Sequence, residues 1–221
     1  FVFDLRVLFH SSVSFSSLQM TAPSACVPDL GVLSEKEEEI LKDLQSLLRL
    51  NLSHIEPTSS GPAEILPHLF LGSRDDAVNV KALQKLGITH VLNCSAATVR
   101  TGEDFYRPFG MGYSEFVAQD EQGYNIMKHY DLLADLASAV AEKKGRLFIH
   151  CEAGVNRSGA LCLAYHLATS GMGLLGSAKH CKVSRGRICT NPAFQMQVFG
   201  FARQRKLLTS CESSSPLPEG A

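Results

Sequence analysis

The sequence predicts an α/β fold with a central, mostly parallel sheet flanked by helices. Short runs rich in apolar and β-branched residues alternate with longer segments whose apolar residues recur every three or four positions. These two periods are typical of buried strands and of amphipathic helices. Because strands and helices alternate rather than gather in blocks, we expect parallel strands, with a functional site at their carboxyl ends.

The composition is that of one globular domain with extensions. Of the 221 residues, 45% are hydrophobic, and the formal net charge is −1. This charge gives no general attraction to nucleic acid or to an acidic membrane, and no apolar run is long enough to cross a bilayer. Seven scattered cysteines without metal-binding spacing favour a reducing compartment. We therefore expect a cytoplasmic protein, with the nucleus as a second location.

The N-terminal extension is predicted to cover residues 1–62. Its first part, 1–19, lacks an initiating methionine and leads into Met20. The polar residues that interrupt this part do not suit a signal peptide. We interpret 1–19 as translated upstream sequence that is not part of the native protein.

A helix is predicted over 34–50, because Ser34 and Glu37 form a capping box ahead of apolar residues that share one helical face. Two interpretations of this helix are open: it packs on the surface of its own domain, or it docks a partner protein. The Pro, Ser and Gly residues that follow make 51–62 a linker.

A compact domain is predicted over 63–208, followed by a disordered tail over 209–221 that is rich in Ser, Pro and Glu. The strands of this domain are predicted at 64–66, 69–71, 88–93, 113–117 and 146–149. Its helices are predicted at 75–86, 125–144, 160–168, 174–183 and 192–208.

The segment 148–159 carries the strongest chemical signal. An apolar strand ends at Cys151, and Arg157 opens a helix after five intervening residues. A tight strand-to-helix loop points backbone N–H groups at one spot, which attracts an anion. The same field favours the thiolate form of a cysteine, which is its nucleophilic form. Arg157 adds a planar fork that suits two phosphate oxygens. A surface Arg and a strand-end Cys without function would leave Gly154 unexplained.

The Cys-x5-Arg-Ser pattern from Cys151 to Ser158 resembles the protein tyrosine phosphatase superfamily. The chain around it is similar to the small atypical dual-specificity phosphatases, most of all the VHR-like ones. This resemblance covers 63–208 and rests on four further stretches, namely 83–93, 105–107 with 119–120, 144–146 and 191–194.

The resemblance implies hydrolysis of phosphotyrosine and phosphoserine or phosphothreonine in proteins, with no metal and no other cofactor. Cys151 would attack phosphorus and form a phosphocysteine. Arg157 and the loop N–H groups would stabilise the charge on the equatorial oxygens. The Ser158 hydroxyl would bond the thiolate, and His150 would order the loop. The phosphate-binding loop residues are Glu152, Ala153, Gly154, Val155, Asn156 and Arg157.

The resemblance also implies a general acid, because the leaving oxygen needs a proton. In the family this acid is an Asp on a mobile loop upstream of the nucleophile, and Asp120 lies at the corresponding distance in the polar segment 118–123. Two alternatives are open: Asp120 serves only to cap its loop, or Glu121 is the acid.

Two residues of the loop bear on the substrate. Asn156 stands where many relatives have Ser. The sequence Asn-Arg-Ser-Gly that it begins resembles the RNA 5′-phosphatase branch. Glu152 stands where phosphoinositide phosphatases carry Lys, and its carboxylate would repel a highly anionic headgroup. We therefore favour phosphorylated proteins as substrates, with RNA 5′-ends or phosphoinositides as the alternative. A non-catalytic phospho-binding scaffold is the third hypothesis.

Three residues outside the loop have two interpretations each. Arg185 and Arg187 lie where VHR-like enzymes bind a second substrate phosphate, or they are solvated arginines at a helix end. Cys94 ends a neighbouring strand. It either forms a reversible disulfide with Cys151 after oxidation or is small core filler.

Overall fold

The structure is a computed structural model that describes residues 30–49 and 61–209. The predictions for 1–19, for most of the linker 51–62 and for the tail from residue 210 lie outside the described residues. Among the described residues, no helix has the length and apolar character needed to cross a membrane.

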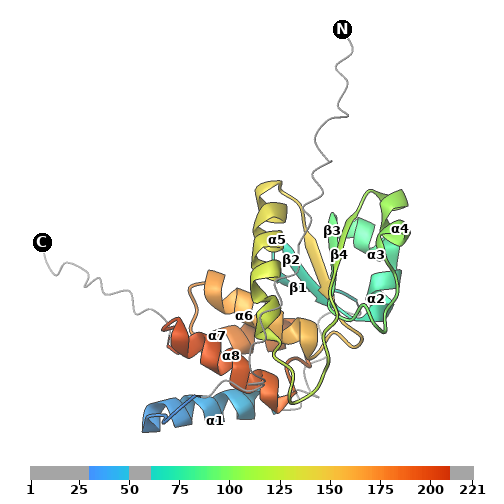
Figure 1. The fold of residues 1–221 in the computed structure, drawn as a ribbon. Coiled ribbons are helices and arrows are strands. Elements are labelled where there is room, and N and C mark those ends of the chain that lie inside the picture. Colours follow the sequence, from blue (N-terminus) through green and yellow to red (C-terminus); the bar gives the residue numbers. More distant parts are fainter. Residues whose placement is uncertain (1–29, 50–60, 210–221) are drawn as a thin grey trace, which may run out of the picture.

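Five strands form one sheet in the order β1-β2-β5-β3-β4 (Figure 1). Only β1 and β2 pair antiparallel, while β2, β5, β3 and β4 run parallel. The predicted, mostly parallel α/β sheet is therefore confirmed. The strands are β1 (Ala63–Leu66), β2 (Leu69–Gly72), β3 (His90–Asn93), β4 (Gly112–Glu115) and β5 (Leu147–His150).

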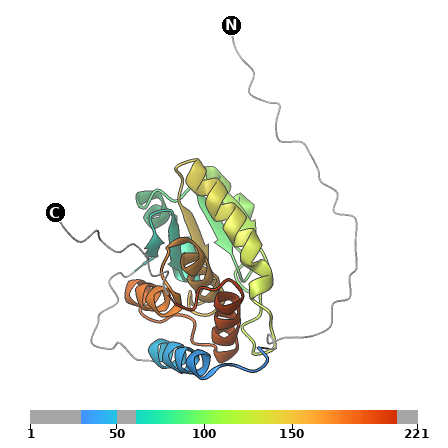
Figure 2. The ribbon, with the colours of Figure 1, turned by 90° about the vertical axis from the view of Figure 1, so that its left-hand side faces the viewer.

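Helices cover both faces of this sheet (Figures 1 and 2). A smaller layer consists of α2 (Arg74–Val78), α3 (Val80–Lys85) and α4 (Glu103–Tyr106). The larger layer consists of α1 (Glu35–Arg49), α5 (Tyr130–Glu142), α6 (Arg157–Thr169), α7 (Leu174–Arg185) and α8 (Pro192–Gln204). Two 3-10 turns complete the described elements, η1 (Arg107–Phe109) and η2 (Met127–His129).

The alternation of side chains along the strands explains the two layers. Phe70 and Phe148 pack with the smaller layer, whereas their neighbours Leu71 and Ile149 pack with the larger one. Successive residues of a strand point to opposite faces of the sheet. Both faces are apolar, so the sheet is buried on both sides, as the alternating strand and helix pattern predicts.

Three details differ from the predicted elements. The helix predicted over 75–86 is two helices, because the backbone at Asn79 is not helical and its side chain caps α3 instead. The helix predicted over 125–144 begins as the 3-10 turn η2. The segment between β3 and β4, for which no helix is predicted, contains α4 and η1, which bury Tyr106 in the smaller layer.

The helix α1 packs on its own domain, against α7 and α8. Leu44 and Leu48 are buried there. The buried Lys182 of α7 donates from Nζ to the Leu48 carbonyl at 3.0 Å. Arg203 of α8 contacts the Glu37 carboxylate at 2.6 Å. The apolar face of α1 is therefore used by the domain itself, as the first of the two interpretations states.

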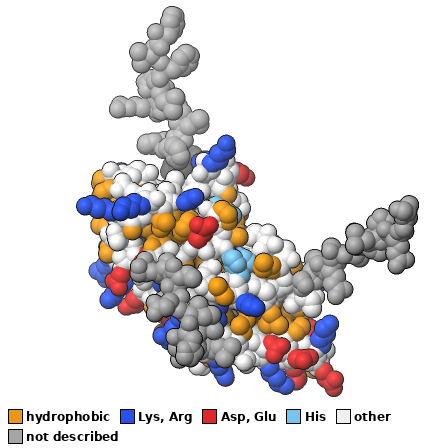
Figure 3. Space-filling view, turned by 180° about the vertical axis from the view of Figure 1, so that it is seen from behind, with side chains coloured by type: hydrophobic (Ala, Val, Ile, Leu, Met, Phe, Trp, Pro, Cys, Tyr) orange, Lys and Arg blue, Asp and Glu red, His pale blue; other side chains and the backbone are white. Residues whose placement is uncertain are grey.

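The surface is mixed in charge. Figure 3 shows Lys and Arg side chains interspersed with Asp, Glu and hydrophobic ones over the described part of one face. This mixture agrees with the net charge of −1.

Candidate active site

The Cys loop, residues 151–156, joins β5 to α6. Its start is fixed by β5, which lies between β2 and β3 and is buried along its whole length. Cys151 is 1% exposed. Gly154 has φ of 64°, and a Cβ there would collide with the backbone of Gly72 at the end of β2. Only glycine suits both the left-handed backbone and this close approach.

The carbonyl groups of the Cys loop bind partners outside the loop. Glu152 O accepts from the backbone N–H of Arg74 at 2.9 Å, and Val155 O accepts from the backbone N–H of Cys189 at 2.8 Å. The carbonyls of Ala153 and Gly154 accept from Arg185 Nη2 and Nε at 3.3 and 3.2 Å.

These contacts determine where the loop N–H groups point. No described peptide bond is cis, and in a trans peptide the C=O and the following N–H point in opposite directions. Because the carbonyls of 152–155 face outward, the N–H groups of 153–156 face the inside of the loop. Such a ring of donors at a helix N-terminus binds an anion.

Ser158 and the sulfur of Cys151 are in direct contact. The Ser158 Oγ donates to Cys151 Sγ at 3.1 Å, and Ser158 is fully buried on the first turn of α6. A hydroxyl that donates to sulfur stabilises negative charge on it. The pairing implied by the family resemblance is thus present in the geometry.

The side chain of Arg157 is 11% exposed and contacts residues of two loops. Its Nη1 donates to Ala118 O at 3.3 Å, and its Nη2 lies 3.7 Å from Glu152 Oε2. Its Nε is buried and has no hydrogen-bond partner among the described residues. A buried donor without a partner carries a desolvation cost, and an oxyanion bound in the loop would remove that cost.

Arg185 contacts the carbonyls of the Cys loop, and its role in a second phosphate pocket stays a prediction. Its side chain is 15% exposed, and besides the two loop carbonyls its Nη1 donates to Gly61 O at 3.3 Å. Its donors are therefore engaged with the backbone rather than directed at a substrate. Arg187 is exposed, and its role in a second pocket stays a prediction.

His150 is buried at the end of β5 and contacts the first carbonyl of the loop. Its Nδ1 lies 3.2 Å from Cys151 O, and its ring stacks on Phe148. Burial lowers the pKa of His150 to about 4, so the ring is neutral at pH 7 and Nδ1 donates its proton to the carbonyl. This geometry agrees with a role in ordering the loop.

Asp120 lies against the Cys loop, although it is 31 positions away in the chain. Its Oδ2 accepts from Asn156 Nδ2 and its Oδ1 accepts from Asn191 Nδ2, both at 3.0 Å. The carboxylate is thus bound by side chains of other segments rather than by the N–H groups of its own loop. This argues against the loop-capping alternative.

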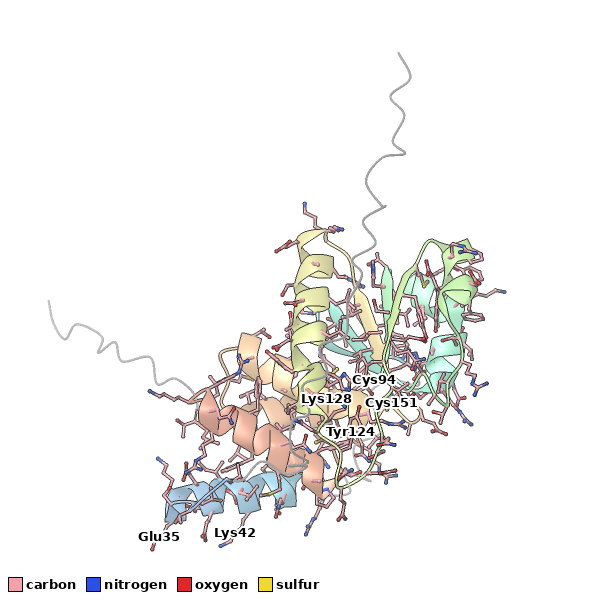
Figure 4. All side chains as sticks on the ribbon, in the orientation of Figure 1. Glu35, Lys42, Cys94, Tyr124, Lys128 and Cys151 are labelled. Carbon is pink, nitrogen blue, oxygen red and sulfur yellow. The ribbon has the colours of Figure 1, made fainter. Side chains whose placement is uncertain are left out.

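Cys94 follows β3 directly, next to Cys151 after β5, because Asn93 pairs with His150 in the sheet. Figure 4 shows the two cysteines close together at one end of the sheet. Burial raises the pKa of the Cys94 thiol well above its usual value, and the nearby Cys151 adds to the effect. Cys94 is therefore protonated at rest, and its pairing with Cys151 stays a prediction.

Sequence reasoning missed several contacts that hold the site together. Asn191 belongs to the stretch 191–194 that carries the family resemblance, yet its side chain also contacts Asp120. Gln197 of α8 accepts from Ile126 N and donates to Tyr124 O, and no local pattern announces this role. Both residues act across the fold, so spacing along the chain gives no signal for them.

An inner strand of the parallel sheet leads into a loop with a buried thiol and inward N–H groups, and an arginine follows on the next helix. This arrangement defines the class of cysteine-dependent phosphatases. Within that class the chain belongs to the dual-specificity phosphatases: residues 69–204 match the family described as "Dual specificity phosphatase, catalytic domain". Members are cysteine-based protein phosphatases, and a phosphocysteine mechanism is general for the family.

The chain is similar to several named relatives. It is 34% identical to human dual specificity protein phosphatase 26 over 142 residues, which are 64% of this chain and 67% of that protein. It is 35% identical to human dual specificity protein phosphatase 2 over 144 residues, but these cover only 44% of that protein. Among solved structures, DUSP15 superposes with a TM-score of 0.58 at 25% identity, covering 68% of this chain and 94% of that one.

Proposed function

We propose that this protein hydrolyses phosphotyrosine and phosphoserine or phosphothreonine in other proteins, with Cys151 as nucleophile and Asp120 as proton donor. The observation that carries the proposal is the Cys loop. A buried sulfur that accepts from Ser158 begins a loop with inward N–H groups, and Arg157 follows this loop with an unpartnered Nε. This arrangement fits a phosphoryl group with its three charged oxygens.

In the first step the Cys151 thiolate attacks phosphorus, and the bond between phosphorus and the leaving oxygen breaks. The loop N–H groups and Arg157 stabilise the charge on the three equatorial oxygens. Asp120 gives its proton to the leaving oxygen, so that a neutral tyrosine, serine or threonine departs. The product on the enzyme is a phosphocysteine.

In the second step water attacks the phosphocysteine. Asp120, now ionised, takes a proton from this water, which makes the water a better nucleophile. The bond between phosphorus and sulfur breaks, and inorganic phosphate leaves. The Ser158 hydroxyl stabilises the sulfur as it regains its negative charge.

The geometry favours protein substrates over RNA ends. The RNA alternative depended on Asn156, and this side chain is engaged with Asp120 and with the Thr190–Asn191 backbone. Glu152 stands partly exposed at the loop and contacts Arg74 and Arg157. Its carboxylate disfavours a highly anionic phosphoinositide headgroup.

A cytoplasmic and nuclear location and a docking role for α1 stay predictions.

The test compares the wild-type protein with Cys151→Ser on four substrates: a phosphotyrosine peptide, a phosphothreonine peptide, RNA with a 5′-triphosphate and a phosphoinositide. We expect phosphate release from the two peptides only, and a loss of about 10⁴-fold or more in the variant, since removing a nucleophile has effects of this size. Preferred hydrolysis of RNA or of the lipid would contradict the proposal. The same variant, used to capture phosphorylated proteins from cells, would give candidate substrates.

A further inference from the structure

We propose that Asn156 is a positioning residue that holds Asp120 over the Cys loop, with Asn191 as its counterpart on the other carboxylate oxygen. This inference rests on the proposed function, in which Asp120 gives and takes the proton. Asn156 belongs to the Cys loop and is next to Arg157, so it ties the proton donor to the phosphate-binding machinery directly.

The orientation of the Asn156 amide follows from its partners. Its Oδ1 lies 2.8 Å from Thr190 N and 3.0 Å from Asn191 N. Backbone N–H groups only donate, so the atom that faces them is the oxygen. The NH₂ group therefore faces Asp120, where a carboxylate oxygen accepts from it at 3.0 Å.

The same reasoning orients Asn191. Its Oδ1 accepts from Ala193 N at 3.0 Å and thereby caps α8. Its Nδ2 faces the other oxygen of Asp120 at 3.0 Å. The two carboxylate oxygens each receive one amide N–H, from two different segments. Two such bonds fix the position and the plane of the carboxylate, which one bond would leave free to rotate.

The rest of the Asp120 loop is held at its ends. At the start, Ala118 O accepts from Arg157, and its N–H donates to Cys94 O at 3.1 Å. At the end, the Tyr124 hydroxyl donates to Val117 O at 2.8 Å. The residues between, 119–123, are exposed. The contacts of Asp120 with the two asparagines thus fasten the middle of an exposed loop.

Asn156→Ser is the first variant. A serine hydroxyl ends one atom beyond Cβ, so it does not reach Asp120. We expect kcat to fall about 10-fold on a phosphothreonine peptide. This loss is smaller than the roughly 10²- to 10⁴-fold loss expected when a general acid is removed completely. On an aryl phosphate with a strongly acidic leaving group, which needs little proton donation, kcat should fall much less than on the phosphothreonine peptide.

Asn156→Asp separates the two functions of this side chain. The aspartate keeps an oxygen for Thr190 N and Asn191 N, so the α8 side of the network stays in place. It puts a second carboxylate oxygen against Asp120, and like charges repel. We expect the same selective loss on the phosphothreonine peptide, and it should be at least as large as in Asn156→Ser.

Thr190→Val is the matched control. It removes only the hydroxyl bond to Asn156 Oδ1 at 3.0 Å and leaves the backbone N–H in place. The ratio of kcat on the two substrates should stay within about 2-fold of wild type, because the backbone N–H groups of Thr190 and Asn191 still hold the Asn156 oxygen.

A double-mutant cycle with Asp120→Asn isolates the proposed link. In the Asp120→Asn background, Asn156→Ser should have no further effect on the substrate ratio, since the proton donor is already absent. An equal loss on both substrates, or a loss that simply adds to that of Asp120→Asn, would overturn the positioning role of Asn156. If Asp120→Asn alone leaves the ratio unchanged, the proton-donor role in the proposed function fails first, and the inference fails with it.

A measurement without substrate keeps the inference testable even if no activity is found. Hydrogen exchange of peptides covering 118–124 should be faster in Asn156→Ser than in wild type, while β5 and α5 are unchanged. Unchanged exchange over 118–124 would show that Asn156 does not hold this loop, whatever the activity.

Discussion

The Cys loop and the Asp120 loop contribute to one site but are built in opposite ways. The Cys loop begins at the buried Cys151, and its carbonyls are bound by backbone N–H groups and by Arg185. The Asp120 loop is exposed from 119 to 123. Its central carboxylate is held by the amides of Asn156 and Asn191.

This difference separates two demands of the chemistry. The anion cradle must be rigid before the substrate arrives, because preorganised donors stabilise charge without rearrangement. The proton donor must let the leaving group in and out, so a loop held by a few side-chain bonds suits it. We therefore expect changes that remove the support of the Cys-loop backbone to affect all substrates alike. Changes at Asp120, or at the asparagines that hold it, should depend on the leaving group.

The largest expected effect comes from Asp120→Ala, which should remove proton donation and leave the Cys loop intact. We expect kcat to fall about 100-fold or more on phosphoserine peptides, whose alkoxide is a poor leaving group, and far less on aryl phosphates with acidic leaving groups. Steady-state kinetics on both substrate types check this. Equal losses on both would remove Asp120 from the acid role, and Glu121→Ala would then be the variant to compare.

Arg185→Met should weaken the support of the Cys loop. It removes three donors from the carbonyls of Ala153, Gly154 and Gly61, and we expect a loss of about 3 kcal/mol in the free energy of unfolding. Because the loop loses its support, kcat should fall by a similar factor for all leaving groups. Arg187→Met, at an exposed position, is the control for stability. A selective loss on doubly phosphorylated peptides would instead support the second-pocket interpretation of Arg185.

The smallest expected effect is on the pH dependence of the free energy of unfolding, through the buried His150 that supports the Cys loop. The pKa of His150 is about 4 in the folded protein and about 6.5 when exposed. Between these values the unfolded chain binds more protons, so stability is lost as the pH falls from 6.5 toward 4. From pH 7 to pH 5 the His150 contribution should be about 2 kcal/mol.

His150→Gln should therefore lose about 2 kcal/mol less than wild type between pH 7 and pH 5, as measured by denaturant unfolding at each pH. Comparing the two proteins cancels the contribution of other buried histidines such as His166, whose pKa burial also lowers to about 4. Parallel pH curves for the two proteins would contradict the assignment to His150.

The strands and the Cys loop could be predicted from the sequence because their signals are local. A short apolar run followed by Cys151, Gly154 and Arg157 specifies a strand, a tight turn and a helix within thirteen residues of chain. The break between α2 and α3 is not predicted, because the helical spacing of apolar residues continues across Asn79. The backbone conformation of Asn79 and the cap that its side chain gives to α3 reveal the break.

Contacts between distant segments could not be predicted in this way. Arg185 and the Cys loop are about thirty positions apart, and its role depends on α7 packing behind β1 and α6. Nothing in the residues around Arg185 distinguishes a donor to backbone carbonyls from a phosphate ligand. The link between Asn156 and Asp120 has the same character, because it depends on where the fold places two loops.

The position of α1 has a practical consequence for work on this protein. The helices that α1 covers, α7 and α8, carry Arg185 and Asn191 at their site ends. A protein trimmed to the family-matched residues 69–204 would leave bare the apolar surface that Leu44 and Leu48 now cover. Such a fragment invites aggregation through this surface. Expression for crystallisation or inhibitor screening should therefore begin upstream of Leu30.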